Sequence, residues 1–135
     1  MNLSPLFDAP LAVQIHVATV VPAFFLGTWQ IFFSRKGAKS HRTLGFVYLA
    51  LMTCTAVTAL FISQVNSGGP LFGLSWIHLF VPVTLWGVVG AICGARTHNI
   101  SMHRSSMIGT YVGGLLIAGG FAFAPGRIMH ALLFG

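Results

Sequence analysis

Residues 11–63 read LAVQIHVATVVPAFFLGTWQIFF, then SRKGAKSHR, then TLGFVYLALMTCTAVTALFIS. The first and third pieces are uncharged and mostly apolar, whereas the short middle piece carries four cations. An α-helix rises about 1.5 Å per residue, so roughly 20 apolar residues cross about 30 Å of hydrocarbon. This stretch therefore predicts two membrane-crossing helices joined by a short polar connection.

The second half of the sequence repeats this arrangement around another basic connection, RTHNISMHR, at residues 96–104. With 135 residues in total, four crossings leave no room for a soluble domain. We therefore expect one all-α domain over residues 1–135, an integral membrane four-helix bundle. Its four spans are expected at about 11–33, 43–63, 75–95 and 105–124.

The composition excludes a soluble or a disordered protein. Apolar residues make up 56% and charged residues 6% of the chain, with 1 acidic residue against 7 Lys and Arg, and the mean hydropathy is +0.86. Such a surface would not stay dissolved, and a disordered chain needs far more charge. The lipid bilayer is therefore the expected surrounding of this chain.

The distribution of cations predicts the orientation of the bundle. Six of the seven lie in the two basic connections, so the positive-inside rule places both connections in the cytoplasm and both termini outside, as in a bacterial inner membrane. Because the charges encode topology in this way, nucleic acid is not an expected partner. The apolar tail 128–134 is too short to cross and is expected to lie along the outer interface.

Little catalytic chemistry is available to this sequence. A single acidic residue excludes a paired-carboxylate hydrolase, and Cys54 and Cys93, which lie in apolar runs, are interpreted as buried free thiols. An ionisable group inside a bilayer is costly and therefore suggests a function. The remaining candidates are the six histidines, His16, His41, His78, His98, His103 and His130.

Four of these histidines are regularly spaced. His16 and His41 are 25 residues apart, as are His78 and His103, and an offset of 62 maps one pair on the other. The spacing predicts two pseudo-symmetric helical hairpins related by an axis along the membrane normal. Across that axis His16 would face His78 near the outer surface, and His41 would face His103 near the inner surface.

Facing histidine pairs suggest haem rather than a single metal ion. A protein-bound metal ion usually needs more than two strong ligands, whereas haem iron needs only two axial ones. We therefore predict one or two b-type haems, with His16 and His78 as ligands of the outer haem and His41 and His103 as ligands of the inner haem. Arg42 and Arg104 would contact haem propionates or lipid headgroups.

Two families resemble parts of this pattern. The alternation of histidines between helices resembles the cytochrome b561 family of transmembrane di-haem reductases, which implies haem ligation by the same four histidines, although that family usually has additional flanking spans. Residues Ser40–Tyr48 and His103–Met107 resemble a family of small four-span bacterial membrane proteins of unknown function.

These observations predict a transmembrane b-type haem electron-transfer protein, an oxidoreductase component if it acts as an enzyme. It would pass electrons between a quinone or small reductant and a partner, as a homo-oligomer or as a subunit of a larger complex. Two alternatives remain open: a cofactor-free assembly subunit and a small solute or metal-ion carrier. His98 and His130 are interpreted as solvated, with His130 as a substitute for one outer ligand.

Glycines in the third and fourth expected spans have two interpretations, a path for the porphyrin plate or close packing of helices. We favour close packing. These glycines are Gly87, Gly90, Gly94, Gly109, Gly113 and Gly114.

Overall fold

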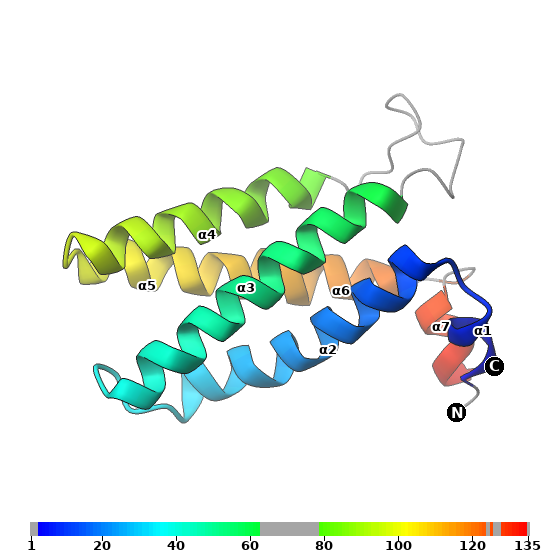
Figure 1. Ribbon diagram of the computed structural model, residues 1–135, viewed down its shortest axis with the longest axis horizontal. Coiled ribbons are helices and arrows are strands. Elements are labelled where there is room, and N and C mark those ends of the chain that lie inside the picture. Colours follow the sequence, from blue (N-terminus) through cyan, green and yellow to red (C-terminus); the bar gives the residue numbers. More distant parts are fainter. Residues whose placement is uncertain (1–2, 63–78, 124, 126–127, 135) are drawn as a thin grey trace.

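The computed structural model describes residues 3–62, 79–123, 125 and 128–134, and the elements in these ranges are all helices (Figure 1). In chain order they are α1 (Ser4–Phe7), α2 (Leu11–Phe32), α3 (Lys39–Ile62), α4 (Phe80–Arg96), α5 (Ile100–Gly109), η3 (Thr110–Ile117), α6 (Ala118–Ala122) and α7 (Ile128–Phe134).

The first two expected spans are helices. The helix α2 matches the range 11–33 closely and is followed by a connection in which Gly37 has a φ of 83°, a conformation that glycine adopts without strain. The helix α3 begins at Lys39, four residues before the expected start. Hydropathy marks only the part of a helix that crosses hydrocarbon, so the polar first turn of α3 was missed. Residue 63 lies outside the described residues.

The helices α4 and α5 cover most of the third expected span and the start of the fourth. The helix α4 ends at Arg96, and residues 75–78 of the expected third span lie outside the described residues. After a turn in which His98 has a φ of 56°, Asn99 caps α5 by accepting a hydrogen bond of 3.1 Å from the backbone nitrogen of Met102. This cap starts the helix five residues before the expected position 105. Residue 124 is also outside the described residues.

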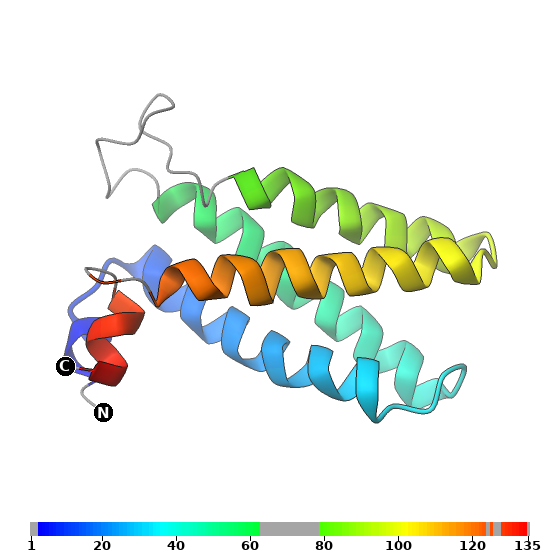
Figure 2. The same ribbon diagram turned by 180° about the vertical axis from the view of Figure 1, so that it is seen from behind.

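The helices α5, η3 and α6 form one continuous rod (Figure 2). Its middle part, η3, has the wider hydrogen-bond spacing of a π-helix. Among the described residues, α2, α3 and the composite helix Ile100–Ala122 are long and apolar enough to cross a membrane, whereas α4 is shorter at 17 residues. The described part of the chain is thus helical, and three of its helices have the length and apolar character of membrane-crossing segments.

The four long rods form a ring of antiparallel neighbours. The helix α2 packs on α3, α3 on α4, α4 on α5 and η3, and η3 on α2. The helices α2 and α4 are therefore diagonal to each other, as are α3 and α5. Residues 33–38 and 97–99 both lie at one end of the bundle, called here the connection end, and α1, α7 and both termini lie at the other (Figures 1 and 2).

The interior of the bundle is small and the exterior is strongly apolar. Trp86 is 78% exposed, and many other large apolar side chains face outward. A bilayer, and not water, suits such an exterior. The buried core cluster consists of Ala23, Tyr48, Leu49, Met52, Val88, Ala91, Met107, Tyr111 and Leu115.

The prediction that both cysteines are buried is wrong. Cys54 and Cys93 are free thiols, as expected, but both are exposed on the outer faces of α3 and α4. The error arose because apolar neighbours in a membrane helix do not indicate the protein interior. In a bilayer the lipid-facing side is as apolar as the core.

Close packing explains the α4 glycines. A Cβ atom at Gly87 would collide with Thr110, one at Gly90 with Ser106, and one at Gly94 with the backbone of His103. These three glycines therefore let α4 closely approach the composite helix Ile100–Ala122, called here the fourth rod.

Gly109 and Gly113 are not needed for a close approach of two helices. A Cβ atom at Gly109 would meet nothing within 4 Å, and one at Gly113 would only touch Val83 at 3.8 Å. The packing interpretation is therefore wrong for Gly109, which faces open space at the surface of the bundle.

Candidate functional site

His16 links α2 to α3 near the end of the bundle that carries both termini. Its Nδ1 lies 2.9 Å from the backbone oxygen of Thr55 and 3.1 Å from Oγ1 of Thr58. The hydroxyl of Thr55 also donates to Oγ1 of Thr19 at 2.9 Å, so threonines of both helices surround the histidine. The half-buried imidazole is thereby held in one orientation.

The carbonyl partner of His16 determines its tautomer. A backbone oxygen only accepts hydrogen bonds, so Nδ1 of His16 must carry a proton and donate it to Thr55. In the neutral ring, Nε2 is then a bare lone pair. No hydrogen-bond partner for that atom occurs among the described residues.

His103 is held in the same way at the connection end. Its Nδ1 lies 2.8 Å from the backbone oxygen of Ala91, one turn before Gly94 on α4. A Cβ atom at position 94 would lie 2.5 Å from the backbone nitrogen of His103, so only glycine allows this approach. His103 therefore also donates through Nδ1 and leaves Nε2 as an acceptor or metal ligand.

His41 lies in the first turn of α3 at the connection end. Its Nδ1 is 2.9 Å from Oγ of Ser34, a partner that can donate or accept, and its backbone oxygen accepts a 2.7 Å hydrogen bond from Nε2 of Gln30. Lys36 in turn donates to the backbone oxygen of Gln30 and, at 3.2 Å, to that of Ile31. These bonds fasten the connection between α2 and α3.

Two of the four predicted ligands lie at the connection end of the bundle. His41 and His103 both lie in the first turn of their helices, on diagonal rods at the connection end. His78, the predicted partner of His16, lies outside the described residues. His98 is exposed in the turn before α5, as expected. His130 is half-buried in α7 with its ring 5.0 Å from that of Phe134.

The cations of the connection end have no carboxylate partner. Arg42 and Arg104 are exposed, and so are the other four cations at this end. The single acidic residue, Asp8, lies between α1 and α2 at the opposite end (Figure 1). The connection end therefore has a surplus of positive charge, of the kind that anionic lipid headgroups attract.

The histidines are the side chains of this site that could hold a cofactor. Within the described ranges, no three side chains of His, Cys, Asp or Glu form a group that could hold a metal ion. Haem iron needs only two axial ligands, and histidines that ligate metals usually donate their other ring nitrogen to a carbonyl. His16 and His103 both have this arrangement. By contrast, Thr110, Ser106 and His103 fill the space over the α4 glycines, so no porphyrin fits between α4 and the helix Ile100–Ala122 at this point.

Two buried polar residues were missed by the sequence analysis. Gln30 is 2% exposed and Tyr48 is 1% exposed, and each has a polar atom without a partner among the described residues. The sequence does contain a signal for Gln30. It is a polar residue within the apolar run 11–33, and polar groups inside a membrane are costly.

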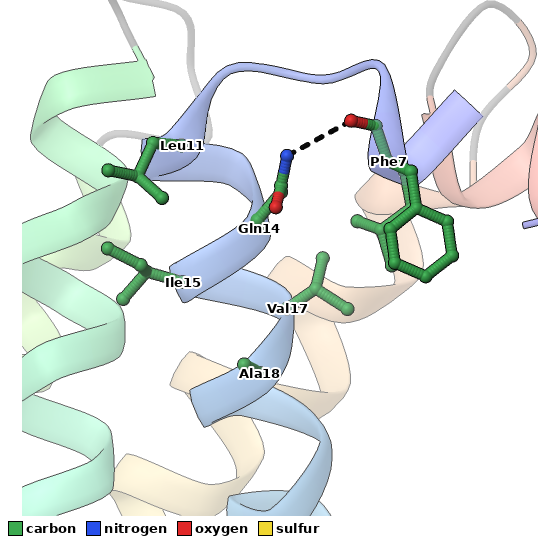
Figure 3. Close-up of a pocket in the computed structure, with 7 residues that line it drawn as sticks. Phe7, Leu11, Gln14, Ile15, Val17 and Ala18 are labelled. Atoms are coloured by element: carbon green, nitrogen blue, oxygen red, sulfur yellow. Dashed lines mark hydrogen bonds between the residues drawn. The ribbon is translucent and has the colours of Figure 1, made fainter. Parts of the chain in front are cut away.

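An open apolar pocket of about 390 Å³ lies where α1 meets α2 (Figure 3). Gln14 is its polar residue, and its Nε2 donates to the backbone oxygens of Phe7 at 3.2 Å and Ala9 at 2.9 Å. These bonds attach α1 to the start of α2. The pocket is lined by Leu6, Phe7, Leu11, Gln14, Ile15, Val17 and Ala18. None of these side chains is a haem ligand, so they do not form a haem site.

The fold and the polar networks define the class of this protein: a small helical membrane protein with histidines anchored between its helices. The chain belongs to the family described as predicted membrane protein (DUF2306), which matches residues 13–132. This finding agrees with the resemblance of Ser40–Tyr48 and His103–Met107 to small predicted membrane proteins. The similarity to cytochrome b561 stays a prediction. No curated protein and no solved structure matches the chain significantly.

Proposed function

We propose that this protein is a four-span, b-type haem electron-transfer protein of the membrane. One observation carries the proposal: Nδ1 of His16 donates to the carbonyl of Thr55 and Nδ1 of His103 to that of Ala91. Both rings are thereby set in the tautomer that an axial ligand requires. In this tautomer the Nε2 lone pair of each ring is available to an iron atom.

When bound, haem supplies reversible one-electron redox chemistry. The chain would supply four axial ligands, His16 with His78 and His41 with His103. The carbonyl bonds of His16 and His103 would orient these two rings and raise their basicity. Arg42 and Arg104 are suited to hold propionates at the connection end, or lipid headgroups beside it. A quinone, a small reductant or a docked polypeptide would exchange electrons with the site, because the short connections hold no soluble redox domain.

The histidine spacing supports two haem levels. From His16 to the end of α2 is about 17 residues, or roughly 25 Å along a helix. Two levels this far apart suit electron transfer from one face of the membrane to the other. The same spacing supports a duplicated hairpin as the origin of the fold, with α2 and α3 corresponding to α4 and α5.

The first test is the visible spectrum of the protein, purified in detergent after expression with added haem precursor. We expect a Soret band that shifts on addition of dithionite, with α-bands of low-spin haem b. A matched preparation of the His16→Ala/His103→Ala double variant should lack most of this absorbance. A protein that folds fully and shows no reducible Soret band would overturn the haem proposal.

That outcome would favour a second function, a cofactor-free assembly subunit. The observation in its favour is the filled groove between α4 and the fourth rod, where Thr110, Ser106 and His103 occupy the space over the glycines. Tight packing of this kind is what a purely structural subunit needs.

We further propose that the connection end faces the cytoplasm, because it gathers six cations. In a Cys54→Ser/Cys93→Ser background, an Asp8→Cys variant should react in intact cells with a membrane-impermeant maleimide. A Thr97→Cys variant should react only after the cells are opened. Labelling of Thr97→Cys, but not of Asp8→Cys, in intact cells would show the reverse orientation.

A further inference from the structure

Two orphaned polar atoms lie in neighbouring layers of the bundle interior. They are Oε1 of Gln30 on α2 and the hydroxyl of Tyr48 on α3. Gln30 is 2% exposed and Tyr48 is 1% exposed, so neither atom can reach solvent or lipid headgroups. An unpaired polar group inside a membrane costs several kcal/mol, which indicates that something bonds to both atoms.

The register of α2 and α3 places the two residues one helical turn apart. The amide of Gln30 lies against Gly45, 3.4 Å from the position of a Cβ there. The ring of Tyr48 lies over Gly27, one turn from Gln30, 2.8 Å from the corresponding Cβ position. The orphaned atoms therefore belong to adjacent layers of one interface.

Tyr111 is the third polar residue of this part of the interior. Its ring also presses on Gly27, next to that of Tyr48, and its hydroxyl is 2.7 Å from Oγ1 of Thr28. Because Thr28 already donates its proton to the backbone oxygen of Phe24, Tyr111 must be the donor in this pair. The hydroxyl oxygen of Tyr111 thus keeps a lone pair that can accept a further hydrogen bond.

The three polar groups match the bonding capacity of one water-sized molecule. Tyr48 offers a proton, whereas Gln30 Oε1 and Tyr111 offer lone pairs. We propose that a buried water molecule accepts from Tyr48 and donates to Gln30 and Tyr111. Three hydrogen bonds are typical of buried water. Both tyrosine rings pack closely on Gly27, so the polar atoms lie in a tightly packed part of the interior.

This site extends the polar network of the connection end into the core. Nε2 of Gln30 donates to the backbone oxygen of His41, so the water would join the first turn of α3 to the tyrosines in the middle of the bundle. The proposal rests on Gln30, Tyr48 and Tyr111 and is independent of haem.

A double-mutant cycle on the full chain in detergent tests the proposal, with the thermal unfolding midpoint as the readout. Removing an unsatisfied hydroxyl would leave Tm unchanged or raise it. If Tyr48 donates to a bound water, Tyr48→Phe should instead lower Tm by about 4 °C. In a Gln30→Met background the water has lost one partner, so the same substitution should lower Tm by much less. Thr53→Val, which removes a hydroxyl bonded only within its own helix, is the control.

A second measurement covers the case in which a variant does not fold. A high-resolution density map of the unaltered protein should show one isolated peak within hydrogen-bond distance of Tyr48 and Gln30. A direct bond between those two side chains, a continuous density larger than water, or a Tyr48→Phe variant as stable as the parent would each overturn the proposal.

Discussion

Replacing His103 with alanine is expected to remove one of the two proposed haems, the one at the connection end, while the other stays bound. The imidazole of His103 is fixed by its bond to the backbone oxygen of Ala91, so alanine removes the ligand nitrogen that this bond orients. His16→Ala should remove the other haem and leave the first. Haem content per protein, measured as the pyridine haemochrome, and the reduced-minus-oxidised spectrum of each variant give the readout.

His98 provides the matched control for this experiment. It is a histidine of the same sequence, exposed in the turn only five residues from His103, and it has a φ of 56°. His98→Asn keeps a residue that tolerates this conformation and should leave the haem content unchanged. If His16→Ala and His103→Ala both keep full haem content, the ligand assignment is wrong even where the protein does bind haem.

The sequence predicted the helices well because the bilayer dictates their length. Residues 11–33 had to form one helix to satisfy their backbone in hydrocarbon, and α2 does so. The starts of α3 and α5 were predicted too late, since polar first turns lie outside the hydrocarbon and carry no hydropathy signal. The cap of Asn99 was visible in the sequence and would have corrected the start of α5.

The direction in which each side chain faces could not be predicted in the same way. In water, an apolar residue is expected inside, but in a membrane both sides of a helix are apolar, so Cys54 and Cys93 were placed wrongly. The hydrogen-bond partners of the histidines could not be predicted either. A bond from His16 to the backbone of Thr55 depends on the register between α2 and α3, which the sequence does not encode locally.

The placement of two histidines at one end of the bundle was predicted from the sequence. That His41 and His103 begin their helices at the same end of the bundle follows from the two basic connections, and the structure confirms it. The roles of Gln30 and Tyr48 were not predicted, because a tyrosine in an apolar run is an ordinary membrane residue. Only the contact of its ring with Gly27 shows that its hydroxyl is enclosed.

Gly94→Ala is expected to destabilise the hairpin of α4 and α5 more than any other single added methyl group on α4. A Cβ atom at this position would lie 2.5 Å from the backbone nitrogen, 2.8 Å from Cα and 3.0 Å from Cβ of His103. None of these atoms can rotate away, so α5 itself must shift. Overpacking of this kind costs about 1–3 kcal/mol, and the thermal unfolding midpoint should fall by several degrees.

Gly109→Ala should have the opposite effect and is the matched control. The added Cβ atom would meet nothing within 4 Å, and alanine favours a helix over glycine by up to about 1 kcal/mol. The same shift of α5 would displace His103 from the carbonyl of Ala91, so Gly94→Ala should also weaken haem binding at the connection end, whereas Gly109→Ala should not. Equal stability of the two variants would show that α4 and α5 are not in close contact at Gly94. A destabilised Gly94→Ala protein with unchanged haem would instead separate the packing of this hairpin from the proposed ligand role of His103.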